Sequence, residues 1–324
     1  MATIIDVAKE ANVSTATVSR VINGSSRINA KTEKKVLDAM SKLNYSPNTI
    51  ARSLARGHND SIGFLLPDLN MPFWAKLAHE VEKCAKLHGW NIMISSAPKS
   101  LDDYYSAYNR LCGSMVSGII TSYVSGSEAF IKESKIPTVT ISNITKNSCS
   151  IASNDEQGGL FATRHLISRG CKNIIHISGE MVPERSSNAR TYAFAKECEA
   201  QGVHYKIYET SLVNQVENDY AGIIGNVFYE NTDFDGIFAS NDILASMCLS
   251  TALALGYRVP QDIKIVGYDD IPISAMIYPP LTTIRQNYQK LSLLAVETVL
   301  NLIHGVEVPE KQLIPVELIV RGTT

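Results

Sequence analysis

The 324-residue sequence predicts an α/β protein: a small helix-turn-helix head followed by a two-lobed core of doubly wound parallel sheets. Three observations support this fold class. Apolar residues recur at helical spacing over the first 46 residues. From Ser61 onward, short apolar runs alternate with amphipathic helical segments, which is typical of parallel sheets covered on both faces. The alternation restarts after about Asp155, which indicates a second lobe and a cleft between the two.

Three short helices are expected in the head. The first opens with a capping box over Thr3–Asp6 and runs through Ala11. After a tight turn at Asn12 and Val13, Ser14 caps the second helix, whose apolar stripe is Val18, Val21 and Ile22. Asn29 caps the third, with an expected core face of Val36, Leu37, Met40 and Leu43.

The outward face of the second helix is small and polar, which suits insertion into a DNA groove. Ala16, Ser19 and Arg20 point away from the apolar stripe, and Thr15 stands at the start of the helix. Residues 1–57 carry a net charge of +5 and the remainder −7, the layout of a DNA-binding head on an acidic regulatory body. Two surface helices of an ordinary helical cap are the alternative interpretation.

Residues 5–24, I-D-V-A-K-E-A-N-V-S-T-A-T-V-S-R-V-I-N-G, resemble the N-terminus of the lactose-repressor/galactose-repressor family of bacterial transcription regulators. The resemblance continues through Leu43–Asn48 and Ala51–Leu54 and covers the whole chain. It implies a homodimer that binds palindromic double-stranded operator DNA. It also implies base contacts by Thr15, Ala16 and Arg20. The resemblance further assigns contacts to the DNA backbone, or support of the helix, to Ser14, Ser19 and Asn23.

The domains are expected at 1–46 for the DNA-binding head, 47–57 for a hinge and 61–324 for the core. Lobe one would take about 61–158 and 288–320, and lobe two about 159–287. Residues 48–56 allow only about two helical turns, too few to be stable alone. The resemblance implies a hinge helix that pairs across the dimer and inserts Leu54, with Ala51 beside it, into the minor groove. A plain linker leucine is the alternative.

In the core, buried strands and covering helices are expected to alternate. Strands are predicted at 61–67, 91–95, 118–121, 138–141, 174–177, 204–208, 236–239 and 263–266. Helices are predicted at 72–87, about 102–112, about 156–169, about 187–201, about 214–229 and about 242–255. A final helix at about 287–303 and a strand at 313–320 are expected to return to the first lobe, as in the resembled family.

Signals for catalysis, metals and membranes are missing from the sequence. It has no G-x-G-x-x-G, Walker loop, G-x-S-x-G or H-E-x-x-H motif. We therefore expect that the protein is not an enzyme and has no cofactor. The six cysteines are scattered without metal-ligand spacing, which indicates free thiols, no metal and a reducing cytoplasm. We find no signal peptide and no apolar run long enough to span a membrane, so a cytoplasmic location without a membrane partner is expected.

Polar and aromatic side chains follow the predicted strands, where ligands bind in such sheets. Phe73 and Trp74 come after the first strand, Ser142 after 138–141, Asn241 after 236–239 and Asp269 after 263–266. The resemblance assigns effector contacts to the same positions. It adds Arg190 in R-T-Y-A-F, with Ala in place of the family's Gly, and Gln286, which closes P-P-L-T-T-I-R-Q. Structural alternatives remain: helix caps for Asp269 and Asp242, a surface ion pair for Arg190, and a core position for Trp74.

One position departs from the family. Many sugar-responsive members carry Asp where this chain has Ser142, so a hydroxyl acceptor is lost and the effector's identity is open. The sequence predicts a dimeric repressor of a carbohydrate-utilisation operon, with operator affinity set by a small sugar between the lobes. The alternatives are a repressor that responds to a nucleobase or nucleoside, a sugar-processing α/β enzyme, and a solute-binding protein, which would need a signal peptide.

Overall fold

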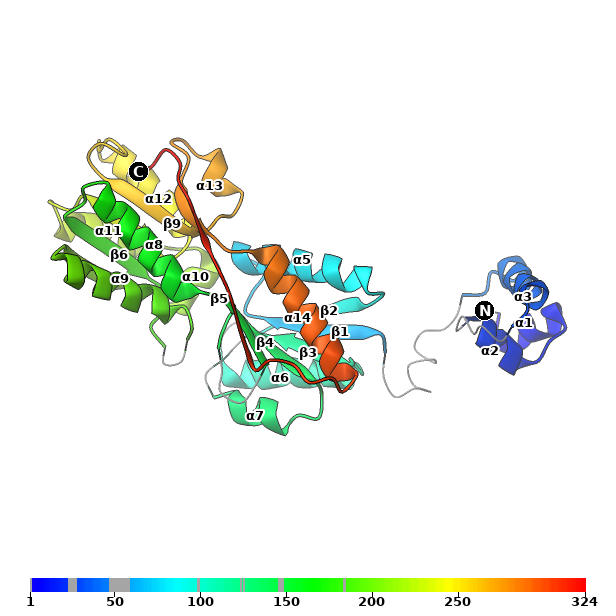
Figure 1. Cartoon of the computed structure of the whole chain (residues 1–324). Helices are drawn as coiled ribbons and strands as arrows, with labels where there is room; N and C mark the ends of the chain where they lie inside the picture. Colours follow the sequence, from blue (N-terminus) through cyan, green and yellow to red (C-terminus); the bar gives the residue numbers. More distant parts are fainter. Residues whose placement is uncertain are drawn as a thin grey trace. The chain divides into compact units, whose positions relative to one another are not determined.

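The computed structural model describes residues 2–22, 28–46, 59–97, 100–122, 124, 126–144, 149–182 and 185–324. It contains two compact units, Met1–Asn59 and Asp60–Thr324 (Figure 1). Each unit has a hydrophobic core of its own. They are described separately below.

The N-terminal unit contains the three predicted helices, α1 (Ile4–Ala11), α2 (Thr15–Ile22) and α3 (Ala30–Lys42). Their first turns are capped as predicted, because each cap lies within three residues of the donor it satisfies. Thr3 and Asp6 form a capping box. Ser14 Oγ accepts a hydrogen bond from Thr17 N at 3.1 Å, and Asn29 Oδ1 accepts one from Thr32 N at 2.8 Å.

One valine from each helix is fully buried in this unit: Val7, Val18 and Val36. The expectation that Leu37 belongs to the core is wrong, since its side chain is 51% exposed. The third helix instead buries Ala39 against the first two, with Met40 and Leu43 packed beside it. Leu37 follows Val36 by one residue, about 100° around the helix, and therefore falls outside this narrow stripe.

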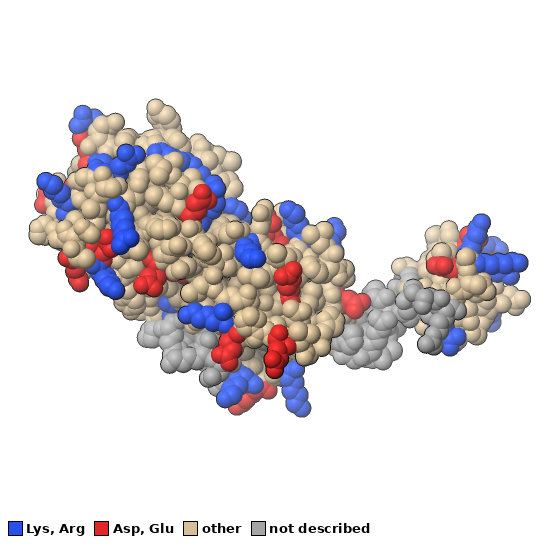
Figure 2. Space-filling model, in the orientation of Figure 1, with Lys and Arg blue, Asp and Glu red and all other residues tan. Residues whose placement is uncertain are grey.

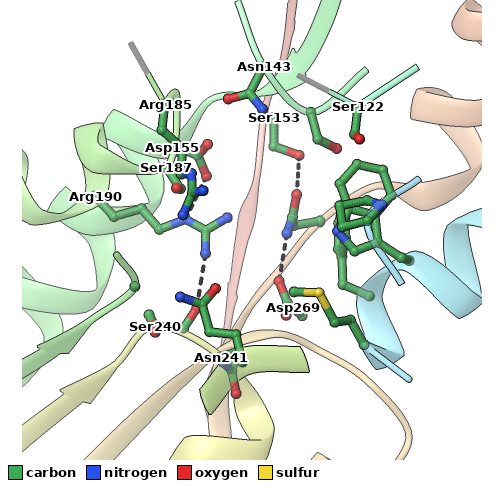
Figure 3. A pocket seen from close by; sticks show the side chains of 18 of the residues that line it. Ser122, Asn143, Ser153, Asp155, Arg185, Ser187, Arg190, Ser240, Asn241 and Asp269 are labelled. Atoms are coloured by element: carbon green, nitrogen blue, oxygen red, sulfur yellow. Dashed lines mark hydrogen bonds and ion pairs between the residues drawn. The ribbon is translucent and has the colours of Figure 1, made fainter. Parts of the chain in front are cut away.

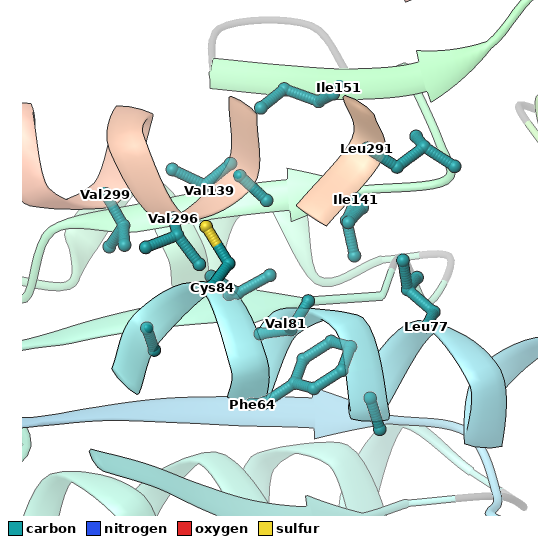
Figure 4. Packing of buried hydrophobic residues seen from close by; sticks show 14 of the residues in the cluster. Phe64, Leu77, Val81, Cys84, Val139, Ile141, Ile151, Leu291, Val296 and Val299 are labelled. Atoms are coloured by element: carbon teal, nitrogen blue, oxygen red, sulfur yellow. The ribbon is translucent and has the colours of Figure 1, made fainter. Parts of the chain in front are cut away.

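The first lobe of the core is a six-stranded parallel sheet in the order β11-β5-β4-β3-β1-β2. Its elements are β1 (Ser61–Leu66), α5 (Pro72–Leu87), β2 (Asn91–Ser96), α6 (Leu101–Gly113), β3 (Gly118–Thr121), α7 (Glu128–Glu133), β4 (Thr138–Ile141), β5 (Cys149–Ser153), α14 (Tyr288–Ile303) and β11 (Lys311–Ile314). Helices α5 and α14 pack side by side on one face, with Val81, Leu291 and Val296 in the core between them and the strands (Figure 4). Helix α6 packs on the other face.

The second lobe repeats this architecture, in the order β12-β10-β9-β8-β6-β7. Its elements are α8 (Asp155–Ser168), β6 (Asn173–Ser178), α9 (Asn188–Gln201), β7 (His204–Glu209), α10 (Leu212–Glu217), α11 (Ala221–Glu230), β8 (Gly236–Ala239), α12 (Asp242–Ala254), β9 (Lys264–Asp269), α13 (Ile273–Met276), β10 (Thr282–Arg285) and β12 (Glu317–Ile319). Helices α8 and α9 cover one face, and α11 and α12 the other.

Three expectations for the core need correction. The helix expected at 214–229 is two helices, because Asn218 ends α10 in a left-handed conformation (φ 52°). The strand expected at 313–320 is also divided, at Pro315, which has no N–H to continue a strand ladder. Its second part, β12, pairs antiparallel with β10, so residues 317–319 belong to the second lobe and not to the first. Strands β5 and β10 were not predicted; they are short and rich in Ser and Thr.

The chain passes between the two sheets three times: after β5, after β10 and between β11 and β12. Polar residues at the carboxyl ends of strands in both sheets therefore meet beside these crossovers. This meeting point is the cleft described next.

Candidate functional site: a DNA-facing helix and an inter-lobe cleft

The outward face of α2 carries the side chains predicted to contact DNA. Thr15, Ala16 and Arg20 are exposed, and Ser19 is half-buried. Ser14 is exposed, but its hydroxyl is already engaged in the cap of α2. Lys and Arg side chains project from the visible surface of this unit (Figure 2). The other predicted DNA-binding positions, Asn23, Ala51 and Leu54 with the hinge at 47–57, lie outside the described residues.

The seven residues predicted to contact an effector all line one pocket between the lobes (Figure 3). Phe73, Trp74 and Ser142 come from the first lobe, Arg190, Asn241 and Asp269 from the second, and Gln286 from the crossover after β10. The pocket thus brings together side chains that are up to 213 positions apart, from Phe73 to Gln286. Effector binding by these residues stays a prediction.

Arg190 has an acidic partner and a side chain that is only 13% exposed, so it is not the surface ion pair that the sequence left open. Its Nε donates to Asp155 Oδ1 at 2.7 Å, and its Nη1 donates to the carbonyl of Ser240 at 3.0 Å. The guanidinium lies 3.5 Å from the centre of the Tyr268 ring. Burial alone would lower the pKa of Arg190, but Asp155, Tyr268 and Asp269 together raise it above its ordinary value. The side chain is therefore a fixed cation with further N–H groups to offer to a ligand.

Asp269 ends β9 with a left-handed backbone (φ 103°), a conformation that costs a non-glycine residue energy and often marks a functional position. Its Oδ1 accepts a hydrogen bond from Gln286 Nε2 at 2.6 Å. Gln286 Oε1 in turn accepts one from Ser153 Oγ at 2.6 Å, so the relay runs from the second lobe to the first. Burial raises the pKa of Asp269 to about 7, despite the opposing effect of Arg190 and the Gln286 hydrogen bond.

Asn241 is the N-cap of α12, since its Oδ1 accepts a hydrogen bond from Leu244 N at 2.8 Å. Its amide nitrogen donates to Tyr220 Oη at 3.0 Å and keeps one N–H for a ligand. The neighbouring Asp242 does not line this pocket. It is fully buried, and its Oδ2 accepts a hydrogen bond from Ile271 N at 2.8 Å, so it supports the segment that follows Asp269.

The two aromatic residues play different parts in the first-lobe wall. Trp74 is only 7% exposed and belongs mainly to the core between α5 and the sheet, as its structural alternative proposed. Phe73 is half-buried at the edge of that core and meets Trp74 edge-on, at 5.1 Å between ring centres and 86° between planes. Phe73 therefore supplies more of the aromatic surface available to a ligand.

A lacI-family sequence model, described as bacterial regulatory proteins, matches residues 3–48. A periplasmic binding protein-like domain model matches residues 163–324. The "Ribose operon repressor" of Halalkalibacterium halodurans is 33% identical over 100% of this chain and 97% of its own length. The chain belongs to the lacI family of bacterial regulatory proteins.

Other relatives agree with this assignment. The "HTH-type transcriptional repressor PurR" of Pasteurella multocida is 33% identical over 91% of the chain and 90% of its own length. The crystal structure of the Lac repressor dimer bound to operator and the anti-inducer ONPF has a TM-score of 0.89 and 28% identity, covering 99% of this chain and 98% of that one. These matches confirm the predicted family and fold. As a lacI-family member the chain is a DNA-binding transcriptional regulator, not an enzyme.

Sequence reasoning missed several polar residues of this lacI-family cleft. They are Ser122, Ser153, Asp155, Arg185 and Ser187. The signal for two of them was present, because Ser153 and Asp155 stand at and just beyond the end of β5. Recognising that strand would have selected both by the strand-end rule. Arg185 gave no such signal, because it lies in a loop and not at the end of a strand. Its Nη1 donates to the carbonyl of Glu180 at 3.2 Å.

Ser142 also has a left-handed backbone (φ 63°). Its hydroxyl is buried and has no hydrogen-bond partner among the described residues. The adjacent Asn143 joins the lobes, because its Oδ1 accepts a hydrogen bond from Ser186 N at 2.8 Å. The first-lobe wall near Ser142 is thus formed by uncharged hydroxyl and amide groups.

No group of three or more His, Cys, Asp or Glu side chains in the described ranges could hold a metal ion. Within the same part of the chain, no helix is long and apolar enough to cross a membrane. All six cysteines are free thiols.

Proposed function

We propose that this lacI-family regulator is a homodimeric repressor of a carbohydrate-utilisation operon. The two heads would bind a palindromic double-stranded operator, and a small sugar in the cleft would set their affinity for it. Ribose operon repressors among the relatives and the Lac repressor dimer on its operator support this proposal. Such a protein would act in the cytoplasm, where operator DNA is found.

The observation that carries the sugar assignment is the set of side chains that converge on the cleft. Arg190 and Asn241 offer N–H donors, and Asp269 offers a carboxylate oxygen, all on the second-lobe side. Vicinal hydroxyls of a sugar can donate to a carboxylate and accept from a guanidinium at the same time. Phe73 on the opposite wall supplies the apolar surface on which a sugar ring packs.

The alternative effector, a nucleobase or nucleoside, is supported by the PurR relatives and by the aromatic pair at 73–74. A flat base binds best between two aromatic faces. Here Phe73 and Trp74 meet edge-on, and Trp74 is buried in the first-lobe core. Among the residues that line the pocket, the second lobe contributes His176 as its one aromatic ring, and that ring is already stacked on Phe238. The cleft therefore favours a hydroxylated ligand.

Calorimetric titration of the full-length protein with a panel of pentoses, hexoses and purine bases tests the proposal. We expect saturable binding of at least one sugar and a change in operator affinity when that sugar is present. Saturable binding of a purine base alone, with the sugars inert, would replace the sugar assignment by the nucleobase alternative.

We propose the domain division at 1–46, 47–57 and 61–324, with residues 317–319 transferred to the second lobe. The chain divides into its two compact units between Asn59 and Asp60, near the proposed boundary between hinge and core. The family resemblance alone supports a hinge helix that inserts Leu54 into the minor groove.

Replacing Arg20 by alanine is expected to weaken the specific operator far more than random DNA. Arg20 is exposed on the outward face of α2, and an arginine that pairs with two acceptors of guanine contributes about 1–3 kcal/mol of base discrimination. Fluorescence anisotropy with operator and with shuffled DNA at one salt concentration measures both losses. Lys31→Ala, which removes the same charge from the exposed surface of α3, is the matched control. Equal losses on both DNAs would reduce Arg20 to a phosphate contact.

Effector affinity is expected to fall when the pH is lowered through about 7. A sugar hydroxyl that donates to Asp269 needs the ionised carboxylate, and the pKa of that carboxyl is raised to about 7. Below this pH the carboxyl is protonated and binding must displace the proton, so affinity falls by up to about tenfold per pH unit. His176 also lines the cleft, but burial lowers its pKa to about 4, so it stays neutral in this range. Titrations at pH 6, 7 and 8 measure the effect. A flat profile would mean that no hydroxyl donates to Asp269.

A further inference from the structure

Two consecutive non-glycine residues at the end of β9 have left-handed backbones: Asp269 with φ 103° and Asp270 with φ 52°. Such a turn is costly and persists only where its surroundings hold it. This turn also sets the direction of the Asp269 carboxylate, which lies in the cleft wall (Figure 3). The groups that hold the turn therefore control the effector site.

The second lobe holds the turn through the carboxylate of Asp270. Arg285 Nε and Arg321 Nη2 each donate to it at 2.6 Å, and Ser274 Oγ donates at 3.0 Å. These donors come from β10, from the segment after β12 and from α13. All three belong to the same lobe as the turn, so these hydrogen bonds to the Asp270 side chain do not depend on the first lobe.

The first lobe holds the turn through its two carbonyl oxygens. Tyr288, whose ring is buried in the first-lobe core, donates its hydroxyl to Asp269 O at 3.0 Å. Lys76 on α5 donates its ammonium to Asp270 O at 3.1 Å. The same ammonium lies 4.2 Å from the centre of the Tyr288 ring, within the range of a cation–π contact. Lys76 thus contacts both the turn and Tyr288, the other first-lobe residue that holds the turn.

Lys76 does not line the effector cleft. It lies on a second cavity at the crossovers, together with Glu80, Arg285 and Glu317. Lys76 can therefore influence an effector in two ways: its hydrogen bond holds the backbone of the turn, and the positive charge of its ammonium acts on Asp269. Because α5 packs into the first-lobe core, a movement of that lobe relative to the second changes the distance between α5 and the turn that Lys76 contacts.

We propose that Lys76 is a positioning residue for the effector site: from the first lobe it holds the 269–270 turn so that the Asp269 carboxylate faces the cleft. Loss of this contact when the lobes move would weaken the site, and effector binding would favour the lobe arrangement that keeps it. The role of the site in effector binding rests on the proposed function, but the contact itself does not.

The charge of Lys76 gives this contact a measurable signature. The ammonium lowers the pKa of Asp269, in opposition to the burial that raises it. The other ionisable groups that interact with or adjoin Asp269 come from several elements: Asp155 (α8), Arg190 (α9), Tyr220 (before α11), Asp242 (α12), Tyr268 and Asp270 (either side along the chain), and Tyr288 (α14). None of these is altered by a substitution at position 76.

The test uses the full-length protein without effector and compares Lys76→Met with Lys76→Arg. Lys86→Met removes the same charge from an exposed position of α5 and is the matched control. Hydrogen exchange reports the turn through the Ile271 amide, which is bonded to Asp242 in the interior. Carbon-13 labelling of aspartate carboxyls reports the pKa of Asp269, with the signal identified by its absence in Asp269→Asn.

In Lys76→Met we expect the amides of 269–271 to exchange about tenfold faster, the effect of losing one charged hydrogen bond. The pKa of Asp269 should also rise. Lys76→Arg, which keeps a donor and a cation over Tyr288, should remain close to the wild type, as should Lys86→Met. Unchanged exchange or an unchanged Asp269 pKa in Lys76→Met would overturn the proposal. So would an arginine variant that behaves like the methionine variant. A sugar panel without binding would instead reject the proposed function and leave these effector-free results standing.

Discussion

Arg190→Ala is expected to weaken effector binding strongly and, at the same time, to destabilise the core. The guanidinium would be lost as a ligand donor, which costs about 1.5–3 kcal/mol of effector affinity, or roughly 10- to 150-fold. Asp155 would lose its partner while its side chain remains only 6% exposed. Leaving one member of a buried ion pair alone typically costs about 3–5 kcal/mol of stability. Thermal unfolding and calorimetric titration measure the two effects separately.

A second variant separates the two roles of Arg190. In Arg190→Ala/Asp155→Asn no buried charge is left unpaired. The oxygen of the new side-chain amide would still accept the hydrogen bond from Tyr268 Oη, which lies 3.0 Å from Asp155 Oδ1 in the wild type. We expect this double variant to recover most of the lost stability but none of the effector affinity. Operator binding without effector should remain near wild type in the double variant, because the head is a compact unit of its own. Recovery of both properties would show that Arg190 serves the fold alone.

Asp269→Asn is expected to cause a large loss of effector affinity with no loss of stability. The amide oxygen can still accept the hydrogen bond from Gln286 Nε2, so the relay to Ser153 survives. A sugar hydroxyl would lose its charged acceptor, at a cost of about 1.5–3 kcal/mol. Gln286→Ala provides the comparison, because it removes the relay and leaves the carboxylate in place.

The stability of the same variant depends on pH in a direction that follows from the raised pKa. The pKa of Asp269 is about 7 in the folded protein against 3.8 for an ordinary aspartate. The stabilisation that Asp269 contributes is therefore full below pH 3.8 and is lost as the pH rises through 7. Relative to wild type, Asp269→Asn should gain up to about 1.4 kcal/mol of unfolding free energy per pH unit in this window. Urea unfolding of both proteins at pH 5 and 8 measures the gain. A constant difference would mean that Asp269 titrates as an ordinary aspartate.

The sequence by itself determined the features that depend on near neighbours. The capping box at Thr3 and the cap at Asn29 could be predicted because donor and acceptor are three residues apart. Buried strands such as β1 were predictable because each is a short apolar run between helical segments. The strand-end rule selected Phe73, Trp74, Ser142, Asn241 and Asp269, because parallel strands align their carboxyl ends at one edge. The family resemblance, and not this rule, added Arg190 and Gln286, which line the same pocket.

Tertiary structure decided which of these side chains meet and what each of them does. Asp155 is 35 residues from Arg190, and Lys76 is 194 residues from Asp270, so no local pattern indicates either contact. Trp74 and Phe73 are adjacent in the sequence, yet packing of α5 on the sheet buries one and leaves the other at the cleft. The elevated pKa of Asp269 has the same origin, because burial is set by elements that surround the side chain only after the lobes have folded.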